Sequence, residues 1–329
     1  MVVALRGDTR DTAVYVDVFF DTRTFPLDPI DYYRDTNIEW AFGIVSWIFN
    51  AIGLGPGALF FLISLLTFVL IDRTARQLGL RLIDVLPFYL GSFYLLQQFM
   101  TIRQGLGVAF ATSVVVTNIV SGSRAWRILG GAVVALTVHL VSIVPVLVGR
   151  ILQALLPSPQ RALVVLWAVI IVAVSAAAAR LFTSLDLVVA MDRLAAYASD
   201  PELGAQRGFL EPAKIRAALV LSVAVIAPVV LLRSRPYLLL LGMYAAHFGL
   251  RLGFYDFAIL SGRLATSLGF VEVFLLPLII RTAIRANWLR WSLCLSYLAV
   301  HAFATLTIQA PYLLDDYFTP LHPDYATTR

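Results

Sequence analysis

Residues 162–182 read "ALVVLWAVIIVAVSAAAARLF" and contain one charged residue, Arg180. An α-helix needs about 20 predominantly apolar residues to cross the hydrocarbon core of a bilayer, and this stretch reaches that length. The core holds no water to bond exposed backbone N–H and C=O groups, so a spanning segment must satisfy them internally, as a helix does. Residues 162–182 therefore predict a transmembrane α-helix.

The rest of the chain has the same apolar character. Of its 329 residues, 60% are hydrophobic and 14% are charged, whereas a soluble domain is about half apolar and a quarter charged. Residues 39–54 are a shorter apolar stretch, which predicts an interfacial or partly inserted helix. Further spans are expected at 57–72, 84–101, 104–121, 128–149, 214–232, 236–250, 268–284 and 288–310. We therefore predict an all-α, polytopic transmembrane helical bundle of about nine spans, forming one integral membrane domain over residues 1–329.

Arginine-rich loops predict the orientation of the chain, because short basic loops stay on the cytoplasmic side. Four loops have this composition, at residues 72–81, 121–127, 233–235 and 281–290. With these loops inside, three segments are expected outside the cytoplasmic membrane: the polar stretches 6–38 and 184–213, and the loop 251–267. Both polar stretches are too short for an independent core.

The same charges give conflicting positions for the ends of residues 128–149. The flanking segments 121–127 and 150–161 are both predicted to be cytoplasmic, yet only one apolar segment separates them. A re-entrant hairpin resolves the conflict, with His139 near its turn and Pro145 breaking its return arm. The alternative is a single span with one loop that violates the charge rule.

Arg103 is the one charged residue of "QQFMTIRQGLGVAFATSVVVT", residues 97–117. Arginine stays protonated in proteins, and at membrane depth it requires an anionic partner or water. A structural pair with a carboxylate is one explanation. However, Arg103 lies at the predicted outer start of a helix, where the helix dipole is already positive. That position favours a bound anion.

The remaining composition argues against several classes of protein. A single cysteine and four scattered histidines give no metal-ligand spacing, and no G-x-x-x-x-G-K-[ST] motif is present. We therefore expect no metal, no other cofactor and no nucleic-acid partner. His247 and His301 are interpreted as structural.

The N-terminal apolar stretch "MVVAL" is too short for a signal peptide. We expect either that the chain starts outside the membrane or that a first helix is missing. Residues 6–38 are expected to fold over an outer cavity as a lid or wall. Five aromatic side chains would pack there, namely Phe19, Phe20, Phe25, Tyr32 and Tyr33, and four aspartates would meet arginines of the facing loops, namely Asp8, Asp11, Asp17 and Asp21.

Five elements, in order along the chain, resemble those of EpsG-type (Wzy-like) polysaccharide polymerases. They are "RGDTRDTAVYVDVFF" (6–20), "NIEWAFGIVSWIFNAIG" (37–53), "FMTIRQGLGVAFATSVV" (99–115), "LTVHLVSIVPVL" (136–147) and "GRLATSLGFVEVFLLPLII" (262–280). Two departures stand out. Gly107 occupies a position where a larger residue is more usual, and the D-T motif is doubled, so that Asp8 competes with Asp11 for the acidic position.

The resemblance implies a polymerase of a bacterial exopolysaccharide or O-antigen-like glycan in the cytoplasmic (inner) membrane, with its active site facing outward. It implies an all-helical fold of the lipid-donor glycosyltransferase kind. The donor would be a growing glycan on undecaprenyl diphosphate, and the acceptor the next lipid-linked repeat unit. Membrane lipid, a chain-length regulator and a flippase of the same pathway would be its partners.

The chemistry of such a transfer assigns roles to candidate residues. The leaving group is a diphosphate, so cations are needed where its negative charge grows. Arginines supply them without a metal. The expected substrate-binding residues are Arg103, Arg263, Arg251, Tyr15 and Gln104. The acceptor hydroxyl needs a base, for which the candidates in order are His139, Asp11 and Glu39.

Two other functions remain open from the sequence. A transporter or flippase of lipid-linked sugars would also use outward arginines and broken helices, but it should show two similar halves, and the sequence shows none. A membrane-bound acyltransferase modifying a polysaccharide would use an intramembrane histidine, usually beside polar partners. The residues flanking His139, "TVHLVS", are mainly apolar.

Overall fold

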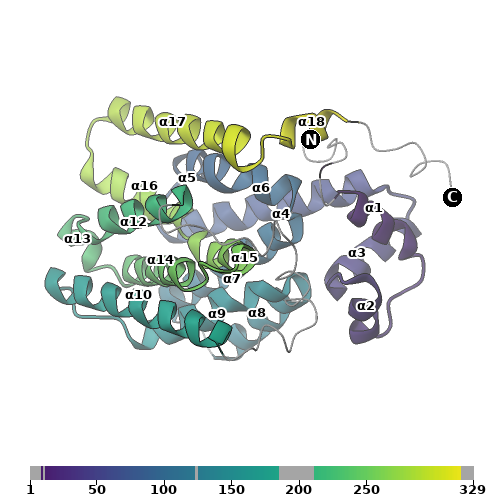
Figure 1. The fold of residues 1–329 in the computed structure, drawn as a ribbon, viewed down its shortest axis with the longest axis horizontal. Helices are drawn as coiled ribbons and strands as arrows, with labels where there is room; N and C mark the ends of the chain where they lie inside the picture. The colour runs from purple at the N-terminus through teal and green to yellow at the C-terminus, as the bar shows by residue number, and fades with distance from the viewer. Residues whose placement is uncertain (1–8, 10–11, 123–124, 185–210, 320–329) are drawn as a thin grey trace. The chain divides into compact units, whose positions relative to one another are not determined.

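The computed structural model describes residues 9, 12–122, 125–184 and 211–319 (Figure 1). Every regular element in these ranges is helical, and they contain no strand. The all-α prediction is therefore confirmed. Asp8, Asp11 and most of the polar stretch 184–213 lie outside the described residues.

The chain forms two compact units. The first contains residues Met1–Val114, Arg124–Ile143 and Trp291–Arg329, and the second contains Val115–Ser123 and Val144–Arg290. The elements that begin in the first unit are α1 (Thr12–Asp21), α2 (Pro29–Thr36), α3 (Trp40–Ala51), α4 (Pro56–Gln77), α5 (Leu82–Tyr89), the π-helical segment η2 (Leu90–Tyr94), α6 (Leu95–Phe99), α7 (Ile102–Ser121), α8 (Ala125–Val138), the 3₁₀ turn η3 (Leu140–Ser142), the π-helical segment η4 (Thr305–Gln309) and α18 (Leu313–Phe318). Helix α9 (Ile143–Ala154) begins at the last residue of the segment Arg124–Ile143 of the first unit and otherwise belongs to the second. The elements that begin in the second are α10 (Arg161–Ser184), α12 (Pro212–Val225), α13 (Val229–Leu232), α14 (Arg235–Gly253), α15 (Ala258–Gly269), α16 (Glu272–Ala283) and α17 (Asn287–Ala304), and most of α17 belongs to the first unit.

Four helices of the described residues are long and apolar enough to cross a membrane. They are Pro56–Gln77, Ile102–Ser121, Arg161–Ser184 and Asn287–Gln309, and a pair bent by 42°, Leu260–Gly269 with Glu272–Ala283, makes a possible fifth. Membrane-spanning helices are therefore supported, whereas the expected number of about nine is not confirmed. The shorter apolar helix Trp40–Ala51 matches the interfacial helix expected at 39–54.

Local chemistry interrupts two of the other expected spans, 84–101 and 214–232. Pro87 lies inside α5, where its missing N–H removes a helical hydrogen bond, and the π-helical segment η2 follows three residues later. Helix α12 stops at Val225, before Pro228. The loop expected at 251–267 is wrong over most of its length, because α14 continues to Gly253 and α15 begins at Ala258. The segment "AILSGRLATSLG" contains no proline and forms a regular helix.

The segment 128–149 is broken where the charge pattern predicted a turn. Helix α8 ends at Val138, His139 has extended backbone angles (φ −162°, ψ 125°), and η3 follows. Pro145 does not break the return arm as expected. It occupies the first turn of α9, where its missing N–H would have had no intrahelical partner.

Whether this broken segment is re-entrant stays a prediction. We expect single cysteines at positions 123 and 155, in a Cys294→Ser background, both to react with a membrane-impermeant thiol reagent from the cytoplasmic side only. The reason is that the basic segments flanking 128–149 both carry the charge of cytoplasmic loops. Labelling from opposite sides would show that residues 128–149 cross the membrane once.

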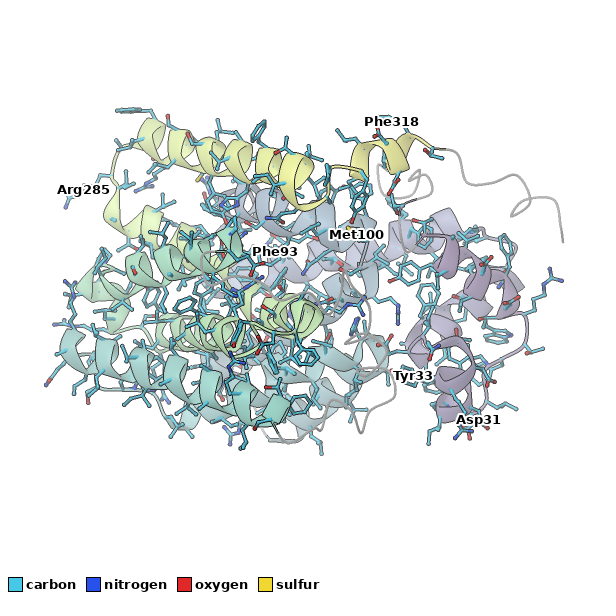
Figure 2. The ribbon with its side chains drawn as sticks, in the orientation of Figure 1. Asp31, Tyr33, Phe93, Met100, Arg285 and Phe318 are labelled. Atoms are coloured by element: carbon cyan, nitrogen blue, oxygen red, sulfur yellow. The ribbon has the colours of Figure 1, made fainter. Side chains whose placement is uncertain are left out.

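The N-terminal segment is folded onto the first unit. Phe19 is fully buried and Tyr15 is 4% exposed, and both belong to an aromatic-rich core with Phe42 and Phe60. Helix α2 is closed by local caps: Asp28 accepts hydrogen bonds at its N-terminus, and Asn37 adopts a left-handed conformation (φ 60°) at its C-terminus. Asp31, labelled in Figure 2, is exposed and pairs with Arg34 at 3.0 Å.

In the second unit, small residues let α10 and α14 pack closely. A Cβ on Gly249 would lie 2.5 Å from the Val172 carbonyl oxygen and 2.8 Å from Ser175 Cβ. A Cβ on Gly253 would overlap Ala179. This packing is typical of membrane helices, where small residues permit close backbone approach.

Candidate functional site

Glu39 is the centre of a polar cluster in the first unit. It precedes α3 in the N-cap position but makes no side-chain capping bond to that helix. Instead, its carboxylate pairs with the Arg103 guanidinium through Oε2. Its Oε1 accepts a hydrogen bond from the Leu140 N–H at 3.1 Å. Glu39 is 8% exposed. Through these two contacts its carboxylate links the start of α3 to α7 and to the break after α8.

Arg103 lies in the first turn of α7, and its side chain is 15% exposed. Its Cζ atom is 5.2 Å from the centroid of the Tyr15 ring, within the range of a cation–π contact. The buried Nε of Arg103 has no hydrogen-bond partner among the described residues. Glu39 therefore binds the guanidinium group at Nη1. The Nε–H donor remains unused among the described residues.

The imidazole ring of His139 is fixed by a hydrogen bond from the turn that follows it. The Val141 N–H donates a hydrogen bond to its Nδ1 at 3.2 Å, whereas Glu39 Oε1 lies 3.6 Å from the same nitrogen. The first distance is within hydrogen-bonding range and the second is beyond it. We therefore assign a neutral imidazole that accepts at Nδ1 and carries its proton on Nε2. The basic lone pair of His139 is thus occupied by the backbone.

Two threonines of the N-terminal segment, Thr9 and Thr12, lie in the same unit and contact each other. Thr9 Oγ1 donates to the Phe99 carbonyl oxygen at 2.7 Å and lies 2.5 Å from Thr12 Oγ1. Helix α1 follows and places Tyr15 beside Arg103. Asp17 is exposed and forms no ion pair among the described residues. Whether Asp17 meets an arginine of the facing loops stays a prediction, and Glu39 is the acid that pairs with Arg103.

Two expected substrate-binding arginines belong to the second unit. Arg251 donates from Nη2 to Thr266 Oγ1 at 3.1 Å and from Nε to His247 Nε2 at 3.3 Å. His247 Nδ1 in turn lies 2.7 Å from the Ala265 carbonyl oxygen, in keeping with its structural interpretation. Arg263 lies on an exposed position of α15. Gln104, by contrast, is in the first unit beside Arg103 and is 3% exposed.

The sequence interpretation missed a buried charge pair in the second unit. Glu272, fully buried, accepts hydrogen bonds from Arg216 and from the Tyr244 hydroxyl, both at 2.9 Å. A glutamate inside the apolar run "FVEVFLLP" was the available signal, since an isolated charge at membrane depth requires a partner. Among the described residues, no group of three or more histidine, cysteine or acidic side chains could hold a metal ion.

Comparison with known proteins decides the family. A family model described as the EpsG family matches residues 1–320. The chain belongs to the EpsG family. The resemblance stated from its five sequence elements is confirmed, and EpsG membership indicates a membrane protein of the surface-polysaccharide polymerase type. No curated protein and no solved structure matches the chain.

The EpsG-like elements converge on the cluster around Glu39. Tyr15, Glu39, Arg103 and His139 each come from a different one of the first four elements, and all four lie in the first unit. The fifth element contributes Arg263 to the second unit. Four separate motifs of the EpsG pattern therefore meet in one cluster.

Gly107, which departs from the EpsG-like pattern, lies where the broken segment rests on α7. A Cβ at this position would overlap Ser142 Oγ and would lie 3.0 Å from Ser142 Cβ and 3.2 Å from His139 Cβ. A larger residue would therefore push the His139–Ser142 turn away from α7 and away from Glu39. The small residue allows this turn to pack as it does.

We expect Gly107→Ala to lower the unfolding free energy by about 1–3 kcal/mol, as other overpacked cores do, and to reduce activity by displacing His139. Thermal unfolding in detergent and polymer length would measure the two effects. Ser142→Gly in the same chain should restore both, because it removes the overlapping atoms. Gly130→Ala is the matched control, since no atom lies within 4 Å of a Cβ there. An unchanged Gly107→Ala protein would contradict this packing.

Proposed function

We propose that this protein polymerises a bacterial surface polysaccharide outside the cytoplasmic membrane. It transfers a growing glycan from undecaprenyl diphosphate to the non-reducing end of the next lipid-linked repeat unit. The observation that supports this most is the partly buried Arg103, held on Glu39 with its Nε donor unused. Such an arginine can receive a phosphate oxygen without losing its carboxylate partner.

The bond changes of this transfer define what the cluster must do. An acceptor hydroxyl oxygen attacks C1 of the donor sugar, the bond from C1 to the diphosphate oxygen breaks, and the hydroxyl proton passes to a base. Arg103 stabilises the charge that develops on the departing diphosphate. Tyr15, stacked on the guanidinium, and Gln104, beside it on α7, orient the substrate.

The geometry changes the expected order of the base candidates. The Nδ1 lone pair of His139 accepts the Val141 N–H, so His139 serves better to hold the turn than to take a proton. Glu39 is nearby and pairs with Arg103. A diphosphate bound at the Nε side of Arg103 shares the guanidinium charge with Glu39, which makes the carboxylate a stronger base. We therefore propose Glu39 as the base, with His139 as a positioning residue and Asp11 as the alternative acid.

Arg263 and Arg251 are proposed as further diphosphate-binding residues. Arg263 is the stronger candidate because its position on α15 is exposed. The Arg251 guanidinium is already bonded to Thr266 and His247, which makes it the weaker one. The proposed mechanism needs no metal, because arginines supply the positive charge.

Purified protein incubated with an undecaprenyl-diphosphate-linked repeat unit tests this function. A polymerase should produce a ladder of longer lipid-linked glycans and release undecaprenyl diphosphate. A flippase would move the substrate across a vesicle membrane without lengthening it. An acyltransferase would change its mass only when an acyl donor is added, and either result would refute polymerisation.

A further inference from the structure

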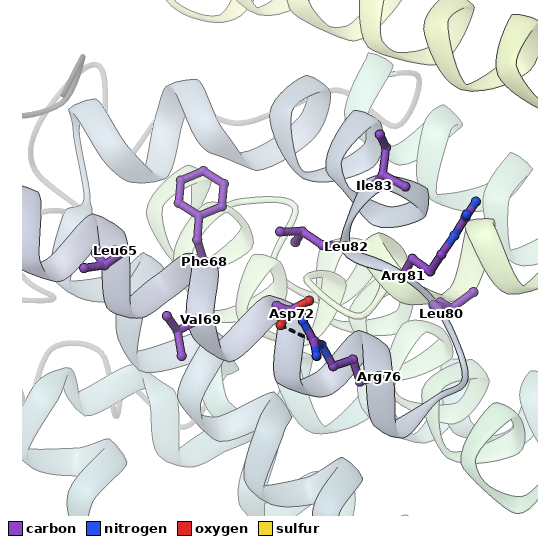
Figure 3. A pocket seen from close by; sticks show the side chains of 9 residues that line it. All are labelled: Leu65, Phe68, Val69, Asp72, Arg76, Leu80, Arg81, Leu82 and Ile83. Atoms are coloured by element: carbon purple, nitrogen blue, oxygen red, sulfur yellow. Dashed lines mark ion pairs between the residues drawn. The ribbon is translucent and has the colours of Figure 1, made fainter.

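A pocket of about 680 Å³ opens on the first unit between α4 and the start of α5 (Figure 3). Most of its lining is apolar, with Leu65, Phe68 and Val69 from α4 and Leu82 and Ile83 from α5. Leu65, Val69 and Ile83 are each between 46% and 53% exposed, so the pocket is open to its surroundings. Helix α4 is long and apolar enough to cross a membrane, and the exposed apolar side chains on such a helix suit a lipid environment.

One end of the pocket is charged. Arg76 Nε lies 2.8 Å from Asp72 Oδ2, and Arg81 pairs with Asp84 at 3.3 Å. The two arginine side chains are 76% and 74% exposed, whereas their aspartate partners are 26% and 20% exposed. Exposed ion pairs of this kind contribute little net stability. The guanidinium groups can therefore bind another anion at small cost.

The length of the pocket along α4 is close to the hydrocarbon thickness of one leaflet of a bilayer. From Leu65 to Arg76 α4 rises about 16 Å, which is close to half of the hydrocarbon thickness of about 30 Å. The opposite end of α4 carries Phe60, whose ring centroid is 6.5 Å from that of Tyr15. The pocket and the Arg103 cluster thus lie at opposite ends of α4, so the pocket is separate from the proposed diphosphate site.

We propose that this pocket binds one anionic glycerophospholipid of the leaflet beside Arg76 and Arg81. An acyl chain lies against Phe68, Leu82 and the other apolar side chains, and the phosphate accepts hydrogen bonds from the two arginines. The charged residues that line the pocket are two arginines and one aspartate, namely Arg76, Arg81 and Asp72, so the charged end has a net positive charge. That charge favours an anionic headgroup over a zwitterionic one.

Binding of phosphatidylglycerol and phosphatidylcholine to the purified full-length protein in detergent tests this proposal. Wild-type protein should bind phosphatidylglycerol tighter by about five-fold for each arginine that contacts the phosphate, and salt should weaken the preference. Arg76→Gln with Arg81→Gln should remove the preference. Val69→Trp, which fills an exposed part of the pocket, should weaken binding of both lipids. Arg73→Gln is the matched control, since Arg73 is in the same basic segment but does not line the pocket.

Three results would overturn the proposal. Equal affinity for the two lipids would show that the arginines do not select the headgroup. An equal loss from Arg73→Gln would indicate a diffuse surface charge rather than a built site. Displacement of phosphatidylglycerol by lower concentrations of undecaprenyl phosphate would assign the pocket to the substrate lipid. Because none of these readouts is polymer formation, failure here leaves the proposed polymerase function intact.

Discussion

Arg103→Lys is expected to abolish most polymer formation, almost as completely as Arg103→Ala. Lysine keeps the positive charge and can still pair with Glu39. It loses the planar fork, however, and so cannot hold Glu39 on one side and a phosphate oxygen on another. Removing one preorganised donor at a developing charge costs about 100-fold to 1,000-fold in rate. The measurement is the rate of glycan lengthening from a lipid-linked repeat unit at equal protein amounts.

The matched control for this variant is Arg73→Lys. Arg73 follows Asp72 near the end of α4, where the same substitution changes an exposed arginine outside the Glu39 cluster. We expect wild-type polymer length there. Normal polymer from the Arg103→Lys protein would show that charge alone is sufficient, and the bidentate role proposed for Arg103 would be wrong.

Glu39→Gln is expected to separate substrate binding from turnover. The glutamine oxygen can still accept the Leu140 N–H, so the turn at His139 is retained. The carboxylate charge is lost, and with it the proposed base, for which a turnover decrease of about 100-fold or more is expected. Arg103 no longer shares its charge with a carboxylate, so lipid diphosphate should bind at least as tightly as to wild type.

The same substitution leaves Arg103 without its counter-charge, and removing one partner of a buried pair costs about 3–5 kcal/mol. Thermal unfolding should therefore show a less stable protein. Glu39→Gln with Arg103→Gln removes both charges and should recover much of the stability but none of the activity. A Glu39→Gln protein that binds lipid diphosphate more weakly than wild type would contradict the proposal that carboxylate and phosphate share the charge of Arg103.

The sequence identified the participants in this cluster but not their pairing. Arg103 and His139 were singled out as polar residues within apolar segments, whereas Glu39 and Tyr15 were singled out through the EpsG-like elements. A bound anion was favoured for Arg103 over a carboxylate because of its position at a helix start, and no local pattern indicated which acid lies nearby. Glu39 and Arg103 are far apart in the chain, so their contact is a product of tertiary packing. Glu272 was missed for the same reason, since its partner Arg216 is on another helix.

Helix positions were predicted well and helix interruptions less well. Apolar length marks where a helix is favourable, which is why α4, α7 and α10 match their expected spans. Interruptions depend on particular neighbours. Pro87 lies inside α5 beside a π-helical segment, whereas Pro145 is harmless because it falls in the first turn of α9. The break at His139 was expected from charge parity, but its stabilisation by Glu39 was not.

The central claim is that Arg103 binds the diphosphate of the lipid donor, and equilibrium binding of undecaprenyl diphosphate tests it most directly. Wild-type and Arg103→Lys proteins would be compared in detergent of the same composition, without acceptor, so that no transfer occurs. We predict binding to Arg103→Lys that is weaker by about ten-fold or more, because one charge-assisted hydrogen bond contributes about 1.5–3 kcal/mol. Equal affinity of the two proteins would contradict the account.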